Sequence, residues 1–333
     1  MSAIHPTAPS SGGRDVKPSC GDQWTIKQYE EVINSFLREI SFTPPHGGPD
    51  LDLVSAVRNR MESQGVSPAT LAVVRQCIET GARISSKTYS YLSPAMQEII
   101  ATYAAYVISI DDLTAEITSD LESYTAALMC GKMQRHTLLQ GFTNHLSDQC
   151  EIFGPFGGDM IVKGSLEFLS SAVVETRETE PMFLPEGASD YLVYFRAKTG
   201  VAEPFAFFCF PEDVYPEATC LETYSKAIPS IMLILGYVND VFSFYKEEAS
   251  PGDAAGFIRS YSKFYNISLI QSLRRITNET LRVVQQLRDI CVGHGRLSEH
   301  MERFVQGYIW YHLTSSRYKL SELDILTLQV KRH

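Results

Sequence analysis

Residues 237–248 have the sequence YVNDVFSFYKEE and follow an apolar run from Ile228 to Val238. Asn239, Ser243 and Glu247 recur at every fourth position in this stretch. Because consecutive residues of an α-helix are about 100° apart, each step of four drifts by only about 40°, and the three oxygens share one face. Amide, hydroxyl and carboxylate oxygens suit a hard divalent cation. The stretch therefore predicts a buried helix that ends in a cation site, with Lys246 beside it to meet an anionic ligand.

A second polar group interrupts another apolar segment, at Asp111, Asp112 and Glu116. We expect this segment to be a helix that begins after Ser93 and ends near Asp112. Burying such carboxylates costs several kcal/mol unless a cation compensates them, and two acids at a helix carboxyl end oppose the helix dipole. Bound Mg²⁺ would resolve both problems. A solvated helix end with surface acids is the alternative interpretation.

The rest of the chain also has a helical pattern. From Trp24 onward, apolar residues recur at spacings of three and four, whereas alternating strand patterns are absent. Ser67 and Ser93, each followed by proline, are typical helix starts. The pattern predicts one all-α domain over 23–325, between a flexible tail at 1–22 and a short tail at 326–333. Helices are expected at 26–40, 51–61, 67 onward, 93–112, 118–130, 134–150, 159–179, 187–198, 201–209, 218–248, 254–291 and 297–319.

Composition excludes several classes of protein. The 333 residues carry 29 Lys and Arg against 39 Asp and Glu, a net charge of −10, which disfavours nucleic-acid binding. No apolar stretch reaches the roughly 18 residues of a membrane span. The amino-terminal residues do not resemble a secretory signal. The seven cysteines show no paired spacing, which favours reduced thiols in the cytoplasm.

Together with Arg317-Tyr318 near the end of the last expected helix, these motifs resemble those of class I terpene cyclases, most closely the trichodiene synthase-like fungal sesquiterpene cyclases. The resemblance implies an α-bundle around an apolar cavity, with three Mg²⁺ ions at its mouth. It implies metal roles for Asp111, Asp112, Glu116, Asn239, Ser243 and Glu247, with Asp111 the principal ligand of the first site. Arg196, Lys246, Arg317 and Tyr318 would bind diphosphate. Gly200 and the two residues after it would form a helix break beside the substrate.

The family's usual third acid is absent. Ala115 occupies its position, and Glu116 is rotated by about 100° to lie over Asp112. The resemblance makes a metal role firmer for Asp111 than for Asp112 or Glu116. Aromatic residues proposed for the cavity wall are Tyr103, Phe205, Phe207, Phe208, Phe210 and Trp310.

The expected activity is that of a sesquiterpene synthase, a carbon-oxygen lyase that ionises farnesyl diphosphate with Mg²⁺, releases diphosphate and cyclises the carbocation. The family resemblance also suggests a homodimer. An isoprenyl diphosphate chain-elongating synthase is one alternative, but it would carry two Asp-rich motifs. A catalytically silent helical protein that binds a lipid is the other.

Overall fold

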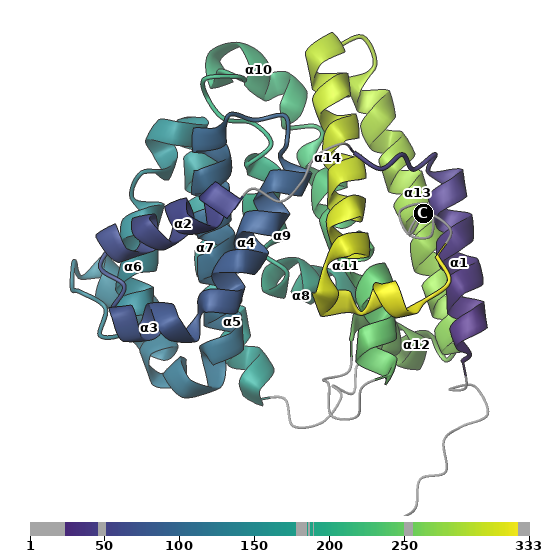
Figure 1. Ribbon diagram of the computed structural model, residues 1–333, viewed down its shortest axis with the longest axis horizontal. Coiled ribbons are helices and arrows are strands. Elements are labelled where there is room, and N and C mark those ends of the chain that lie inside the picture. Colours follow the sequence, from purple (N-terminus) through teal and green to yellow (C-terminus); the bar gives the residue numbers. More distant parts are fainter. Residues whose placement is uncertain are drawn as a thin grey trace, which may run out of the picture.

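The computed structural model describes residues 24–45, 51–177, 185, 187–188, 190–249 and 256–325. This part of the chain is all-helical and contains no strand, which confirms the predicted fold class (Figure 1). The predicted tails, 1–22 and 326–333, lie outside the described residues. The elements are α1 (Ile26–Glu39), α2 (Leu51–Ser63), α3 (Pro68–Val73), α4 (Arg75–Thr88), α5 (Pro94–Met129), α6 (Thr137–Leu146), α7 (Gln149–Arg177), α8 (Tyr191–Thr199), α9 (Ala202–Phe207), α10 (Glu217–Tyr224), α11 (Ile228–Ala249), α12 (Phe257–Tyr265), α13 (Leu269–Cys291), α14 (Gly295–Thr314), and the 3-10 turns η1 (Ser316–Tyr318) and η2 (Leu320–Glu322).

Several helix starts follow the signals in the sequence. The Ser67 and Ser93 side chains accept hydrogen bonds from the backbone N–H groups of Thr70 and Met96, and a proline occupies the first turn of both helices. Thr25 begins α1 with a reciprocal capping box to Gln28. Side-chain capping satisfies backbone donors that a helix leaves unpaired at its first turn.

The helix that was expected to end near Asp112 runs about one turn further, to a kink just before the helix expected at 118–130. α5 continues to Met129 through a kink at Ile117, whose φ of −110° and ψ of 15° are not helical. Asp111 and Asp112 therefore lie more than one turn before the kink and not at a helix end, so the argument from the helix dipole does not apply to them as expected. Residues 113–116 contain no helix-breaking proline or glycine, so nothing in their sequence stops the helix there.

Two long helices expected from the pattern are each divided in the structure. The segment 218–248 forms α10 and α11, because α11 restarts at Ile228 with Pro229 in its first turn. The segment expected at 254–291 contains α12 and α13, because Asn266 ends α12 in a left-handed conformation with φ of 48°. Ser268 then starts α13 with a second capping box.

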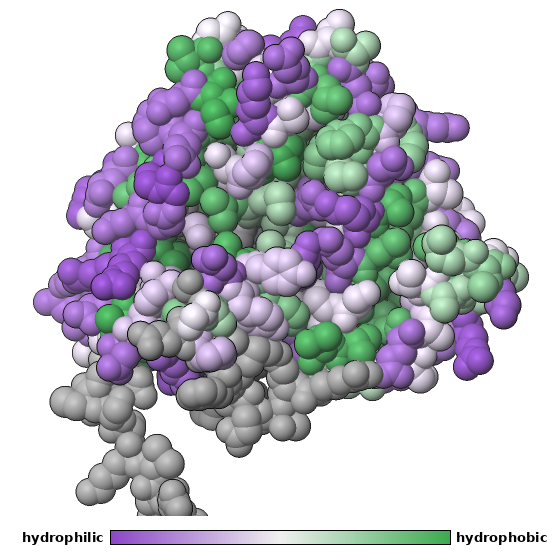
Figure 2. Space-filling view, turned by 180° about the vertical axis from the view of Figure 1, so that it is seen from behind, coloured by the Kyte–Doolittle hydropathy of each residue, from purple (hydrophilic) through white to green (hydrophobic). Residues whose placement is uncertain are grey.

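α11 is the central helix of the fold, between α4 and α5 on one side and α13 and α1 on the other (Figure 1). It is long and apolar enough to cross a membrane, but 72% of its apolar window is buried inside the molecule, so it is a core helix. On the face seen in Figure 2, hydrophobic side chains lie in separated patches among hydrophilic ones.

α4 packs closely against two neighbouring helices through glycine. A Cβ added at Gly81 of α4 would lie 2.6 Å from the Ala101 carbonyl oxygen on α5. A Cβ added at Gly307 of α14 would lie 2.1 Å from the Lys87 carbonyl oxygen on α4. Both distances are shorter than van der Waals contact, so these helix pairs approach more closely than any larger residue would allow.

Candidate active site

A cavity of about 210 Å³ opens among α4, α5, α7, α8, α9, α11, α14 and η1. Its inner wall is mainly apolar and aromatic. Five of the residues predicted for the site line it, and they come from four elements that are distant in sequence: Asp111, Arg196, Asn239, Arg317 and Tyr318. The fold therefore brings carboxylate, guanidinium, amide and phenol groups to one apolar cavity.

Arg196 connects α8 to the polar end of α11. Its Nε donates to Asp240 Oδ1 at 2.8 Å, and its Nη2 donates to Asn239 Oδ1 at 3.0 Å. The Asp240 side chain is only 5% exposed. Burial raises the pKa of Asp240, and the charge and hydrogen bond of Arg196 oppose that rise. This buried ion pair holds Arg196 beside the cavity.

The amide nitrogen of Asn239 faces the opposite way, toward α14 and η1. It donates to the Tyr318 hydroxyl oxygen at 3.1 Å, and it lies 3.3 Å from His312 Nε2. Tyr318 is 4% exposed and His312 is fully buried. Asn239 thus joins α11 to α8 through its oxygen and to the carboxyl-terminal elements through its nitrogen.

Ser243 and Glu247 lie next along α11, as the predicted spacing requires, but neither lines the cavity. The Ser243 hydroxyl donates to the Asp240 carbonyl oxygen at 3.5 Å. Burial raises the pKa of Glu247 to about 6, although the nearby Ser243 hydroxyl and the charges of Arg196 and Lys246 partly oppose it. Gly256 leaves room for the carboxylate, because a Cβ there would lie 1.8 Å from Glu247 Oε2.

The three acidic residues on α5 that were expected to act together have different surroundings in the structure. Asp111 lines the cavity, and its pKa is raised by desolvation and by the Asp112 charge, against Arg317, Arg196 and Lys246. Asp112 accepts a hydrogen bond from Cys77 Sγ at 3.4 Å. Glu116 is exposed and, like Asp112, lies outside the cavity lining. The described residues contain no cluster of three His, Cys, Asp or Glu placed to hold a metal.

Arg317 and Tyr318 were expected near the end of the last long helix. They lie instead in the 3-10 turn η1 that follows α14. Arg317 is exposed, whereas Tyr318 is buried. The expected helix break at Gly200 is present: Gly200 ends α8, and Val201 has a left-handed φ of 50°. Both residues line the cavity.

Of the six proposed aromatic wall residues, Phe205 lines this cavity, whereas Tyr103, Phe207, Phe208, Phe210 and Trp310 do not. The remaining aromatic lining, which the sequence analysis missed, consists of Tyr89, Phe168, Tyr308 and Tyr311. Two of these phenols donate to main-chain carbonyls, Tyr89 to Phe205 at 2.6 Å and Tyr308 to Leu235 at 3.0 Å. The hydroxyl protons of these tyrosines are therefore engaged by the backbone.

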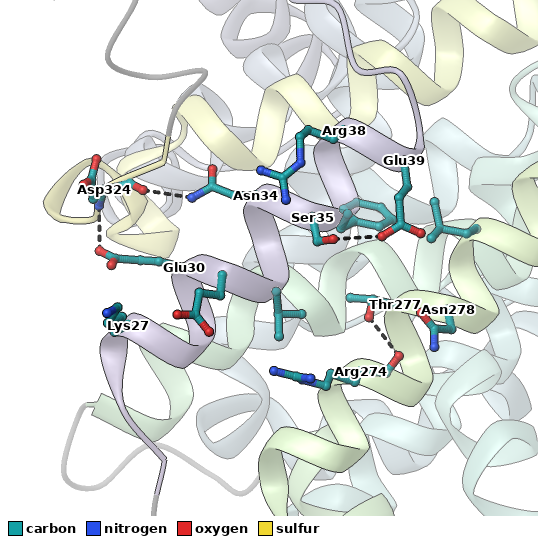
Figure 3. A pocket seen from close by; sticks show the side chains of 14 residues that line it. Lys27, Glu30, Asn34, Ser35, Arg38, Glu39, Arg274, Thr277, Asn278 and Asp324 are labelled. Carbon is teal, nitrogen blue, oxygen red and sulfur yellow. Dashed lines mark hydrogen bonds between the residues drawn. The ribbon is translucent and has the colours of Figure 1, made fainter.

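A larger groove of about 540 Å³ lies on the surface between α1 and α13 (Figure 3). It holds none of the predicted site residues. Its charged side chains include Lys27, Arg38 and Arg274 against Glu30, Glu31 and Glu39, so no charge of one sign dominates. The apolar lining and converging polar groups of the smaller cavity make that cavity the better candidate.

A family model described as trichodiene synthase (TRI5) matches residues 56–327, most of the chain and every residue of the candidate site. The chain belongs to the trichodiene synthase family. This membership confirms the resemblance inferred from the motifs and makes the protein a class I terpene synthase, a carbon-oxygen lyase acting on phosphates.

Individual relatives agree with this membership in the trichodiene synthase family. An (E)-beta farnesene synthase of Metarhizium brunneum is 30% identical over 299 residues, which cover 90% of each chain. A monoterpene synthase of Postia placenta is 26% identical and covers 93% of this chain and 91% of that protein. Longiborneol synthase CLM1 of Gibberella zeae is 23% identical, with 96% and 93% covered.

Solved structures support the fold of this trichodiene synthase family member. A linalool/nerolidol synthase from Streptomyces clavuligerus in complex with 2-fluorogeranyl diphosphate superposes with a TM-score of 0.61 at 14% identity. The alignment covers 82% of this chain and 97% of that one. At this identity the likeness establishes a shared class I terpene synthase fold.

Proposed function

We propose that this terpene synthase acts on farnesyl diphosphate with Mg²⁺ and forms a sesquiterpene. The observation that carries the proposal is the cavity in which Asp111 on α5, Asn239 on α11 and the cations Arg196 and Arg317 meet beside an aromatic wall. The relatives include both sesquiterpene and monoterpene synthases, so the C15 substrate is the finer part of the proposal.

The proposed ligands at the cavity and on the next turns of α11 fit hard cations such as Mg²⁺. Asp111, Asn239, Ser243 and Glu247 offer only oxygen donors, which Mg²⁺ prefers. The raised pKa values of Asp111 and Glu247 indicate carboxylates that lack full compensation, which a cation would supply. Asn239 Oδ1 accepts a bond from Arg196 in this structure, so ligation by that oxygen requires Arg196 to release it.

Arg196, Lys246, Arg317 and Tyr318 are the groups proposed to bind the diphosphate. Arg196 and Arg317 already flank the cavity, and a diphosphate would offer Arg196 a stronger acceptor than the neutral Asn239 amide. Transfer of the guanidinium from Asn239 to the diphosphate would free Oδ1 when substrate enters. Bound Mg²⁺ would act as a Lewis acid that stabilises the departing diphosphate.

The inner wall is suited to a carbocation. Phe205, Tyr308 and Tyr311 surround the cavity with π faces, each worth about 0.5–2 kcal/mol to a nearby cation. Because the Tyr308 hydroxyl donates to the Leu235 carbonyl, that proton is held away from the reacting carbon chain. The wall also excludes water that would quench the cation early.

Incubation with farnesyl diphosphate and Mg²⁺ tests the activity, with products identified by gas chromatography and mass spectrometry. We expect diphosphate release and C15 terpenes, and faster turnover than with the C10 or C20 substrate. No diphosphate release from any of the three would contradict the proposal. Addition of isopentenyl diphosphate should give no longer prenyl diphosphate, since that product would indicate a chain-elongating synthase.

The Asn239→Ala and Glu247→Ala variants test the proposed ligands. Each should lower kcat/KM by at least about 100-fold, because each removes one oxygen of a cation site, while the helical circular dichroism stays unchanged. Asn278→Ala, in the surface groove, is the matched control and should keep full activity. Unchanged kinetics in both site variants would refute the assignment.

A further inference from the structure

His312 is a buried side chain in direct contact with the candidate metal ligand Asn239. It lies in the last turn of α14 with no exposed surface. Its ring stacks on Phe242 of α11 at 5.7 Å and lies 4.6 Å from the ring of Tyr318. The imidazole is thus enclosed by α11, α14 and η1, and its orientation is fixed by packing.

The hydrogen bonds of His312 define its tautomer. Its Nδ1 lies 2.8 Å from the carbonyl oxygen of Tyr308, which can only accept, so Nδ1 carries a proton. Because Arg196 Nη2 donates to Asn239 Oδ1, the Asn239 amide nitrogen faces His312 Nε2 at 3.3 Å. That nitrogen can only donate, so Nε2 accepts and the ring is neutral. A neutral ring with its proton on Nδ1 presents a lone pair at Nε2.

That lone pair and the Arg196 guanidinium together fix which way the Asn239 amide faces. Nδ2 of Asn239 has two acceptors, His312 Nε2 at 3.3 Å and the Tyr318 hydroxyl oxygen at 3.1 Å. Oδ1 has a donor, Arg196 Nη2, at 3.0 Å. If the amide were rotated by 180°, its oxygen would face the Nε2 lone pair, and its NH₂ group would face the guanidinium. Both contacts would be repulsive, so the network admits one orientation.

The same turn of α14 also fixes the position of α11. The Tyr308 hydroxyl donates to the Leu235 carbonyl, one helical turn before Asn239, while the Tyr308 carbonyl accepts from His312. Tyr308 therefore holds the backbone of α11 at Leu235, and His312 contacts the Asn239 side chain one turn later.

We propose that His312 is a positioning residue that holds Asn239 Oδ1 toward the cavity and thereby sets the affinity of the site for its divalent cation. This inference rests on the proposed function, in which Asn239 is a metal ligand. Residues that orient a ligand in this way typically change metal affinity by about 10- to 100-fold when they are replaced.

Binding of Mn²⁺ in the presence of inorganic diphosphate, measured by electron paramagnetic resonance, tests the inference without turnover. His312→Phe keeps the ring volume but removes the acceptor, and it should weaken Mn²⁺ binding at least about 10-fold. His312→Gln places an amide oxygen near the position of Nε2 and should stay within about threefold of the wild type. The Mg²⁺ concentration for half-maximal turnover should shift in parallel.

Nitrogen-15 spectra of the histidine rings provide a test that needs no variant. We expect His312 of the wild type to show a protonated Nδ1 and an unprotonated Nε2 throughout pH 6–8. A protonated Nε2 would overturn the inference, and so would equal Mn²⁺ affinity in the wild type and His312→Phe. A wild type that binds no Mn²⁺ and releases no diphosphate would instead overturn the proposed function together with the inference.

Discussion

Glu247 illustrates how a single proposed metal ligand can oppose stability. Burial raises its pKa from the ordinary 4.5 to about 6, so the folded protein holds this proton more tightly than the unfolded chain. Its stabilising contribution is therefore complete below pH 4.5 and is lost as the pH rises through about 6. Above that pH, the ionised Glu247 carboxylate lowers the free energy of unfolding unless a cation compensates its charge.

Glu247→Gln should remove this pH dependence. Without metal, the free energy of unfolding of the wild type should fall relative to the variant by up to about 2 kcal/mol between pH 4.5 and 7.5, since one pKa unit is worth about 1.4 kcal/mol. Urea unfolding in a chelator at several pH values measures the difference. Parallel pH profiles for the two proteins would contradict the assigned shift.

The resemblance of the motifs to those of class I terpene cyclases predicted which residues meet at one cavity, namely Asp111, Arg196, Asn239, Arg317 and Tyr318. The roles of Asp240 and His312 could not. Asp240 offered a weak signal, as a carboxylate directly after Asn239 in an apolar helix, but its partner Arg196 comes from another helix. His312 offered none, because its contact with Asn239 joins residues 73 positions apart.

At the scale of elements, local signals were reliable where a helix begins and less so where it continues. Ser67 and Ser93 start helices as predicted, because capping is decided within a few residues. The kink at Ile117 carries no local signature, since its neighbours are ordinary helix residues. Whether Asp111 ends a helix or lies within one depends on packing that the sequence alone does not reveal.

Gly256, which precedes α12, leaves the space that the Glu247 carboxylate of α11 occupies. Its φ of −70° is open to any residue, so alanine adds no backbone strain. Gly256→Ala should nevertheless displace the Glu247 carboxylate and weaken Mn²⁺ binding several-fold, because the new Cβ would lie 1.8 Å from Oε2. Metal titration measures the effect. A matched control is Gly236→Ala on α11, where a Cβ meets nothing within 4 Å. Equal affinity in both variants would refute the steric argument.

For the whole molecule, a net charge of −10 must be reconciled with a polyanionic ligand. We expect diphosphate alone to leave the unfolding temperature nearly unchanged, whereas diphosphate with Mg²⁺ raises it. At 100 times the dissociation constant, the linked stabilisation is about 2.7 kcal/mol. Thermal unfolding with each ligand, singly and together, measures the coupling. An equal shift from diphosphate without a divalent cation would show that the arginines suffice.

The close approach of α4 to α5 and α14, at Gly81 and Gly307, bears on how products could diverge. α4 contributes Thr80, Ile84 and Thr88 to the cavity but none of the proposed ligands. Its distance from the neighbouring helices sets the width available to a folded hydrocarbon chain. A methyl group added at either glycine would change that width from outside the cavity, since neither glycine lines it. We therefore expect the spacing of these helices to influence which product forms.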